Sequence, residues 1–89
     1  MDDLAIRRKR LFYQSRHRGT QEGDLVLGGF AQRHLEQFDG DELDQFEALV
    51  EQTDADLMDW IMGRATPPAD LGGTVFHLLV KFKNTLIEN

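Results

Sequence analysis

The sequence predicts an all-α fold, a compact bundle of about five short helices that forms a single domain over residues 1–89. Apolar residues recur at spacings of three and four in several segments, which is the period of a helix with one buried face. Glycine, proline and capping residues separate these segments, and such residues begin and end helices. No segment shows sustained alternation of apolar and polar residues, so we expect no strands.

The first predicted helix covers residues 3–17. Basic residues crowd its last turn and Gly19 follows, which predicts a helix stop with the glycine in a left-handed conformation. Its apolar stripe is loose and consists of Leu4, Leu11 and Tyr13, with Ile6 or Phe12.

The second predicted helix begins at residue 21 or 22, ends near residue 38 and has Thr20 as its N-cap. Gly28 and Gly29 interrupt it, each at a cost of about 1 kcal/mol relative to alanine. Two such costs side by side predict that another helix or a partner approaches the backbone closely here. The apolar face comprises Leu27, Phe30, Ala31, His34, Leu35 and Phe38.

Three further helices are predicted. Asp39 and Asp41 are both good caps for a helix over residues 42–52, and Thr53 caps a fourth helix that ends at residue 62, before Gly63. A proline pair at residues 67–68 marks a loop, and the last helix begins between residues 70 and 74. The residues expected to face inward are Leu43, Phe46, Leu49 and Val50, then Leu57, Trp60 and Ile61, then Val75, Leu78, Leu79, Phe82 and Leu86.

Composition excludes several classes of protein. The chain has no cysteine, which rules out disulfides, thiolate metal sites and cysteine nucleophiles. Its apolar runs, residues 78–80 among them, fall far short of the ~20 residues that a membrane span needs, so we expect no membrane span. The N-terminus is basic but lacks the apolar centre of a signal peptide, which favours a cytoplasmic protein.

The net charge of −6 conceals a strong asymmetry. Residues 1–18 carry six basic and two acidic side chains, whereas residues 36–59 contain ten carboxylates and no lysine or arginine. The basic run at residues 7–10 is short, and the acidic remainder would repel a polyanion, so we expect no nucleic-acid partner. The alternative function is nevertheless a small regulatory nucleic-acid-binding or antitoxin-like protein that uses the basic first helix.

Neither a metal site nor a catalytic constellation is predicted. An EF-hand loop that started at Asp39 or at Asp54 would lack the required glycine and glutamate, so these aspartates are expected to cap helices. The three histidines lie on different predicted helices without ligand spacing, and we expect His34 and His77 to pack beside apolar faces. No side chain has a recognisable nucleophile setting and there is no glycine-rich phosphate loop, so we do not expect an enzyme.

The pattern Arg18-Gly19-x-x-Glu22 stands where the basic segment meets the acidic remainder. One interpretation is structural: Gly19 ends a helix, and an exposed ion pair between Arg18 and Glu22 would contribute only about 0–1 kcal/mol. The other interpretation is functional: glycine lets a partner approach the backbone, while Arg18 and Glu22 offer that partner a planar cation and an acceptor. These residues by themselves are compatible with both.

A longer stretch around this pattern carries a resemblance. Residues 18–22 (RGTQE), followed by residues 24–27 (DLVL) and Phe30, resemble the signature of the succinate dehydrogenase assembly factor 2 family, called SdhE in bacteria. Residues 8–16 (RKRLFYQSR) and the later patterns Phe46-Glu47-x-Leu49 and Asp54-x-Asp56-Leu57-x-x-Trp60 extend the resemblance over about residues 6–61. Gly23 stands where the family commonly has larger side chains, so we expect a looser helix start there.

The resemblance implies a small helical bundle that promotes covalent attachment of FAD to a histidine of the flavoprotein subunit of succinate dehydrogenase, and in some bacteria of fumarate reductase. Such proteins are cytoplasmic assembly chaperones rather than enzymes, and they hold no cofactor stably because the attachment is autocatalytic in the client. The expected partner-binding residues are Arg18, Gly19 and Glu22, flanked by Arg16, His17 and Asp24.

Overall fold

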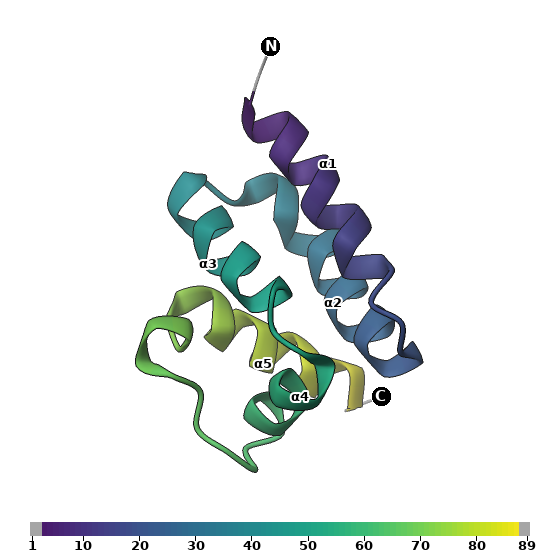
Figure 1. The fold of residues 1–89 in the computed structure, drawn as a ribbon, viewed down its shortest axis with the longest axis vertical. Helices are drawn as coiled ribbons and strands as arrows, with labels where there is room; N and C mark the ends of the chain where they lie inside the picture. The colour runs from purple at the N-terminus through teal and green to yellow at the C-terminus, as the bar shows by residue number, and fades with distance from the viewer. Residues whose placement is uncertain (1–2, 88–89) are drawn as a thin grey trace.

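Helices α1 (Asp3–Arg16) and α2 (Gln21–His34) form an antiparallel pair in the computed structural model, which describes residues 3–87. The two helices lie side by side and are joined by the short link of residues 17–20 (Figure 1). This link brings the basic end of α1 next to the first turn of α2.

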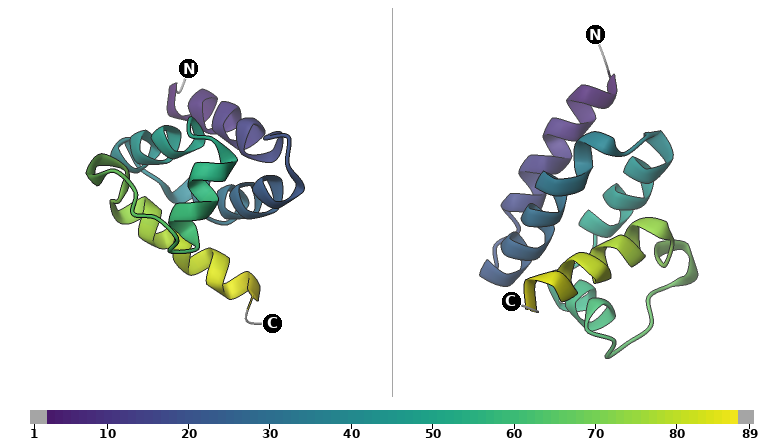
Figure 2. Two further views of the ribbon diagram at one scale, coloured as in Figure 1. Left: turned by 60° about the horizontal axis from the view of Figure 1, so that its bottom comes forward. Right: turned by 180° about the vertical axis from the view of Figure 1, so that it is seen from behind.

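Helices α3 (Gly40–Val50), α4 (Asp54–Ile61) and α5 (Thr74–Ile87) complete the predicted all-α bundle, in which residues 3–87 contain five α-helices and no strand. Helix α5 crosses α2 and α3 and contacts both, and the short helix α4 packs on α5 (Figure 2). A 3-10 turn, Leu35–Gln37, joins α2 to α3, and a second one, Ala69–Leu71, precedes α5. Across the described residues, none of the helices has the length and apolar character needed to cross a bilayer.

The N-caps predicted from the sequence are confirmed. The Thr20 side chain accepts a hydrogen bond from the backbone N–H of Gly23 at 3.0 Å, and the Thr53 side chain accepts one from Asp56 at 3.1 Å. Asp39 forms a reciprocal capping box with Glu42 at the start of α3. These bonds satisfy N–H groups that have no partner within their own helix.

Helix α2 ends at His34, four residues before the predicted end, because the chain tightens into the 3-10 turn and leaves it at Phe38 in an extended conformation. The Arg8 guanidinium donates to the backbone carbonyl groups of Leu35 at 3.3 Å and of Phe38 at 2.7 Å. An arginine of α1 thus donates hydrogen bonds to carbonyl groups just beyond the end of α2, which have no partner within that helix.

The apolar core lies between α1, α2, α3 and α5, with α4 closing one end. Most residues predicted to face inward are buried, and Leu78, Phe82, Leu86 and Trp60 pack against the core in partly buried positions. Two of the fully buried residues are Phe30 and Phe46, whose tilted rings lie 5.7 Å apart between centroids. Six more are leucines: Leu11, Leu27, Leu43, Leu49, Leu57 and Leu79.

The predicted apolar stripe of α1 is wrong in part. Leu11 is fully buried and Leu4 and Phe12 are partly buried, but Ile6 is 51% exposed and Tyr13 is 65% exposed. Successive residues of a helix are rotated by about 100°, which places Ile6 and Tyr13 roughly opposite Leu11. Because one side of α1 packs on α2 and α3, the residues on the opposite side remain on the surface.

The two adjacent glycines of α2 permit close approach of other helices, as predicted. A Cβ atom on Gly28 would lie 3.0 Å from Cγ of Arg16 in α1, and one on Gly29 would lie 3.0 Å from the ring of Phe82 in α5. Helix α2 is therefore packed closely on two sides, and the loss of helix propensity at these positions is offset by contact with α1 and α5.

Candidate partner-binding corner

The link between α1 and α2, with the residues that flank it, forms a sharp corner on the surface; we call residues 16–24 the corner. Gly19 has φ +100°, the left-handed region that the sequence predicted for it. A Cβ atom at Gly19 would have no atom within 4 Å, so the glycine is needed for its backbone conformation and not for lack of space. Gly19, Arg16, His17 and Glu22 are all exposed.

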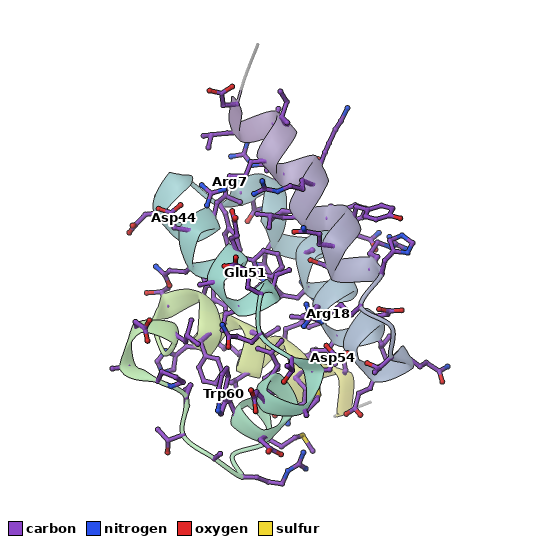
Figure 3. The ribbon with its side chains drawn as sticks, viewed as in Figure 1. Arg7, Arg18, Asp44, Glu51, Asp54 and Trp60 are labelled. Atoms are coloured by element: carbon purple, nitrogen blue, oxygen red, sulfur yellow. The ribbon has the colours of Figure 1, made fainter. Side chains whose placement is uncertain are left out.

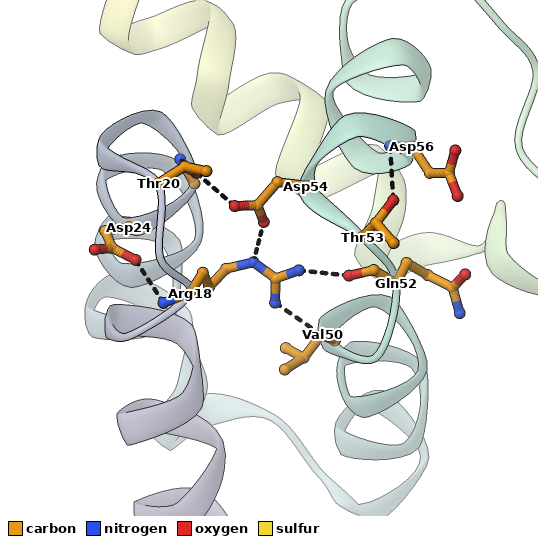
Figure 4. Close-up of polar contacts among 9 residues, drawn as sticks. Arg18, Thr20, Asp24, Val50, Gln52, Thr53, Asp54 and Asp56 are labelled. Carbon is orange, nitrogen blue, oxygen red and sulfur yellow. Dashed lines mark hydrogen bonds and ion pairs between the residues drawn. The ribbon is translucent and has the colours of Figure 1, made fainter.

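The Arg18 side chain turns inward from the corner, and only 8% of it is exposed. Its guanidinium forms an ion pair with Asp54 and donates to the backbone carbonyl groups of Val50 at 2.7 Å and of Gln52 at 2.5 Å (Figure 4). These carbonyl groups lie at and just beyond the C-terminus of α3, where helix carbonyl groups lack partners and the helix dipole favours a cation. Arg18 therefore ties the corner to the link between α3 and α4.

Asp54, the first residue of α4, accepts hydrogen bonds from both Arg18 and Thr20. One carboxylate oxygen accepts from Arg18 and the other accepts from the Thr20 hydroxyl at 2.5 Å. Burial alone would raise the pKa of Asp54, but the hydrogen bonds from Thr20 and Arg18, together with the charge of Arg18, outweigh burial and hold this pKa below its usual range. Asp54 is therefore a carboxylate at neutral pH, already neutralised by Arg18.

Gly23 gives this carboxylate the space that it occupies. A Cβ atom on Gly23 would lie 2.5 Å from Oδ2 of Asp54 and 2.7 Å from Oγ1 of Thr20. The expectation of a looser helix start at this glycine is therefore wrong: Gly23 is buried, and the first turn of α2 is capped and held against α4.

The six predicted site residues do not all face the same way. Arg18 is turned inward, and the Asp24 carboxylate accepts a hydrogen bond from the Arg18 backbone N–H at 2.7 Å within the corner. Glu22 is exposed, and its carboxylate has no hydrogen bond or ion pair within the described residues. The exposed Arg18–Glu22 ion pair considered from the sequence does not form. The proposal that these six residues contact a partner stays a prediction.

Aromatic contacts organise the α1 side of the corner. The exposed rings of Tyr13 and His17 stack at 4.1 Å between centroids, and the Arg16 guanidinium lies 5.2 Å from the ring centroid of Phe12. Sequence reasoning missed Tyr13 as a surface residue, and it missed Asp54 as the shared partner of Arg18 and Thr20. The capping pattern identified Thr20 and the Thr53–Asp54 helix start, but it carried no signal that the two helix starts meet.

The basic run at residues 7–10 is largely engaged within the fold. Arg7 forms ion pairs with Asp44 at 2.6 Å and Glu47 at 2.9 Å, and Arg10 pairs with Glu47 at 2.9 Å. Figure 3 shows Arg7 and Asp44 pointing toward each other from α1 and α3, above the Arg18–Asp54 pair. Two arginines of the basic segment and two carboxylates of the acidic segment are therefore paired across the α1–α3 contact.

The histidines form no metal site in the part of the chain that the structure describes, where no cluster of three or more potential ligands occurs. His34 is half-buried and packed as predicted: its ring stacks on Phe38 and meets the ring of Phe30 at a tilt. Burial lowers the pKa of His34, and the charge of Arg33 lowers it further. The prediction that His77 is packed is wrong: it is exposed, and its Nδ1 lies 2.9 Å from the carbonyl oxygen of Gly73, in the turn before it.

The fold and this site define a small helical protein with a polar surface corner whose backbone is held by hydrogen bonds. Residues 9–83 match the model of the family described as the flavinator of succinate dehydrogenase. The chain belongs to this family, which confirms the resemblance seen in the sequence.

Named relatives lie in bacteria and in mitochondria. The FAD assembly factor SdhE of Acetobacter pasteurianus is 35% identical over 80 residues, which span 90% of this chain and 73% of that protein. The mitochondrial succinate dehydrogenase assembly factor 2 of Cryptococcus neoformans is 41% identical over 73 residues, and that of Dictyostelium discoideum is 36% identical over 79 residues. The chain spans 42% and 56% of these two mitochondrial proteins. All three relatives are named as assembly factors and not as enzymes.

Proposed function

We propose that the chain promotes covalent attachment of FAD to the flavoprotein subunit of succinate dehydrogenase by binding that subunit through the corner. The supporting observation is the exposed corner itself: it carries the Arg18-Gly19-x-x-Glu22 pattern, its backbone is held rigidly, and the Glu22 carboxylate has no partner within the described residues. Family membership and the name of the bacterial relative support the choice of client.

The chain acts in this proposal as a binder that selects one conformation of its client. A protein that binds one conformation more tightly than others shifts the client toward it, by no more than the difference in binding free energy. If the client attaches its own flavin, the helper needs neither a nucleophile nor a cofactor, so the chain holds no FAD stably and acts as a chaperone. Fumarate reductase is a second client in the same proposal, and the bacterial cytoplasm is its location.

Glu22, Gly19 and the Tyr13–His17 stack supply different parts of the binding surface. Gly19 has no side chain, so the client backbone or a flat side chain can approach it. Glu22 is exposed and its carboxylate has no partner within the described residues, so it is free to pair with a cationic or N–H group of the client. Tyr13 adds an exposed aromatic ring of the kind that dominates binding energy at interfaces.

The contacts of the basic run weigh against the nucleic-acid alternative. Three of the arginines that suggested it, Arg7, Arg8 and Arg10, are engaged with carboxylates or backbone carbonyl groups of the same chain. Binding to phosphates would require these contacts to be broken.

Substitution of Glu22 tests the proposal. Glu22→Gln should weaken binding to the purified FAD-free flavoprotein subunit about tenfold or more, which corresponds to about 1.4 kcal/mol, and should slow the appearance of covalent flavin. Asp41→Asn is a matched control, because Asp41 occupies the same second helical position of α3 and is exposed, but lies away from the corner. Equal behaviour of the two variants would contradict the proposal.

A further inference from the structure

We propose that Asp54 is a positioning residue for the corner: its carboxylate holds the residues on both sides of Gly19 and so fixes the corner in the conformation that binds the client. This proposal rests on the proposed function and deepens it, because it adds to the site a residue of α4 that lies outside the Arg18-Gly19-x-x-Glu22 motif.

The geometry that carries the inference is a bridge across Gly19. Oδ1 of Asp54 accepts from the Arg18 side chain, and Oδ2 accepts from the Thr20 hydroxyl. Arg18 and Thr20 are the immediate neighbours of Gly19, so a single carboxylate fixes the chain before and after the one residue of the link with a positive φ. Figure 4 shows Asp54 placed between the two side chains.

The bridge is anchored at both of its ends. Arg18 also donates to the backbone carbonyl groups of Val50 and Gln52. Its guanidinium therefore cannot move with the corner unless these two hydrogen bonds break. Thr20 at the same time accepts the N–H of Gly23, which places the first turn of α2, and Glu22 with it, at a fixed position relative to α4. The position of the exposed Glu22 carboxylate thus depends on Asp54.

Gly23 is part of the same arrangement. Alanine at this position would bring its Cβ within 2.5 Å of Oδ2 of Asp54, so the carboxylate would have to move away from Thr20. The presence of glycine in the first turn of α2 is explained if the contact with Asp54 matters more than helix propensity.

The function of such a bridge is preorganisation. Glycine has the largest conformational freedom of all residues, and a flexible Gly19 would have to be ordered each time the client binds. A corner that is already held avoids this cost and binds more tightly without any added contact. Arg18 is therefore also a positioning residue, and it need not touch the client.

The experiment compares full-length variants for binding to the purified FAD-free flavoprotein subunit. Asp54→Ala should weaken binding about tenfold or more, and Asp54→Asn, which can still accept from Arg18, should recover most of the affinity. Gly23→Ala should weaken binding although it favours the helix. Asp56→Ala and Gly40→Ala are the matched controls, because Asp56 is an exposed first-turn acid of α4 and a Cβ at Gly40 would meet no atom within 4 Å.

Two readouts separate positioning from general loss of stability. Hydrogen exchange should rise in Asp54→Ala at the amides of Arg18, Gly23 and Asp24, which are bonded within the corner, and not in Asp56→Ala. In a Glu22→Gln, Asp54→Ala double variant, the loss of binding free energy should be clearly smaller than the sum of the two single losses, because Asp54 acts through the placement of Glu22. Leu78→Ala, which lowers stability from α5, should leave binding unchanged.

The proposal is overturned if Asp54→Ala binds like Asp56→Ala, or if Leu78→Ala weakens binding as much as Asp54→Ala at comparable stability. It is also overturned if exchange at the three corner amides is unchanged. If the unaltered chain fails to bind the flavoprotein subunit, the proposed function fails, whereas the exchange measurement still decides whether Asp54 orders the corner.

Discussion

The Arg18 guanidinium donates hydrogen bonds to three groups within the fold. Its side chain is 8% exposed and joins Asp54, itself 17% exposed, to two backbone carbonyl groups. Truncation leaves a largely buried carboxylate and unsatisfied carbonyl groups, each of which is costly. The residue is therefore expected to contribute to folding as well as to client binding.

We expect Arg18→Ala to lower the free energy of unfolding by about 2–4 kcal/mol, because a mostly buried ion pair loses one partner. Urea denaturation followed by circular dichroism measures this change. Arg64→Ala is the control: Arg64 pairs with Asp59 at 2.9 Å, but both side chains are about half exposed, and such a pair contributes about 0–1 kcal/mol. A loss at Arg18 no larger than at Arg64 would show that the guanidinium does not hold the corner.

The end of α2 shows how an element boundary depends on packing. His34 is the last residue of the helix. Its ring lies 4.7 Å from the tilted ring of Phe30 and stacks, across the 3-10 turn, on Phe38 at 6.0 Å between centroids. Burial first, and then the charge of Arg33, lowers the pKa of His34, so the folded protein binds a proton there less readily than the unfolded chain.

Stability should consequently fall as the pH is lowered through the usual histidine range toward the lowered pKa of His34. A depressed pKa in the folded state means that the contribution of the neutral ring is complete above the unfolded pKa and is lost as the pH falls through the folded one. Urea denaturation at pH 7 and pH 5 should show a smaller decrease for His34→Phe, which keeps the ring, than for the unaltered chain. Replacement of the exposed His77 by glutamine should leave the decrease unchanged; equal decreases in all three proteins would refute this account.

The starts of the helices could be predicted from the sequence, whereas the meeting of two of them could not. Thr20, Asp39 and Thr53 each bond to a backbone group three residues away, so their roles are visible in a local pattern. The partners of Arg18 lie 32 to 36 residues away, and a periodic pattern contains no information about such contacts. The same limit explains why sequence reasoning did not find that the Arg18 side chain turns toward α4.

At the scale of the whole molecule, the fold places the basic N-terminal segment against part of the acidic segment. The basic first helix lies against the acidic α3, where the charges of Arg7 and Arg10 are paired with Asp44 and Glu47. The net charge of −6 then belongs to the remaining surface. What distinguishes the corner from this surface is its left-handed Gly19, held between two residues that both bond to Asp54, beside the exposed Tyr13–His17 stack.

The most direct test of the central claim is the covalent flavin of the succinate dehydrogenase flavoprotein subunit in a host strain from which the gene for this chain has been deleted. Membrane and soluble fractions are separated on a denaturing gel, and the bound flavin is read by ultraviolet fluorescence. The deletion should abolish the band, the unaltered chain should restore it, and Gly19→Arg should not. Gly63→Arg is the matched control, because Gly63 also has a positive φ of +79° and open space around it, but lies after α4. An undiminished band in the deletion strain, or full restoration by Gly19→Arg, would contradict the account.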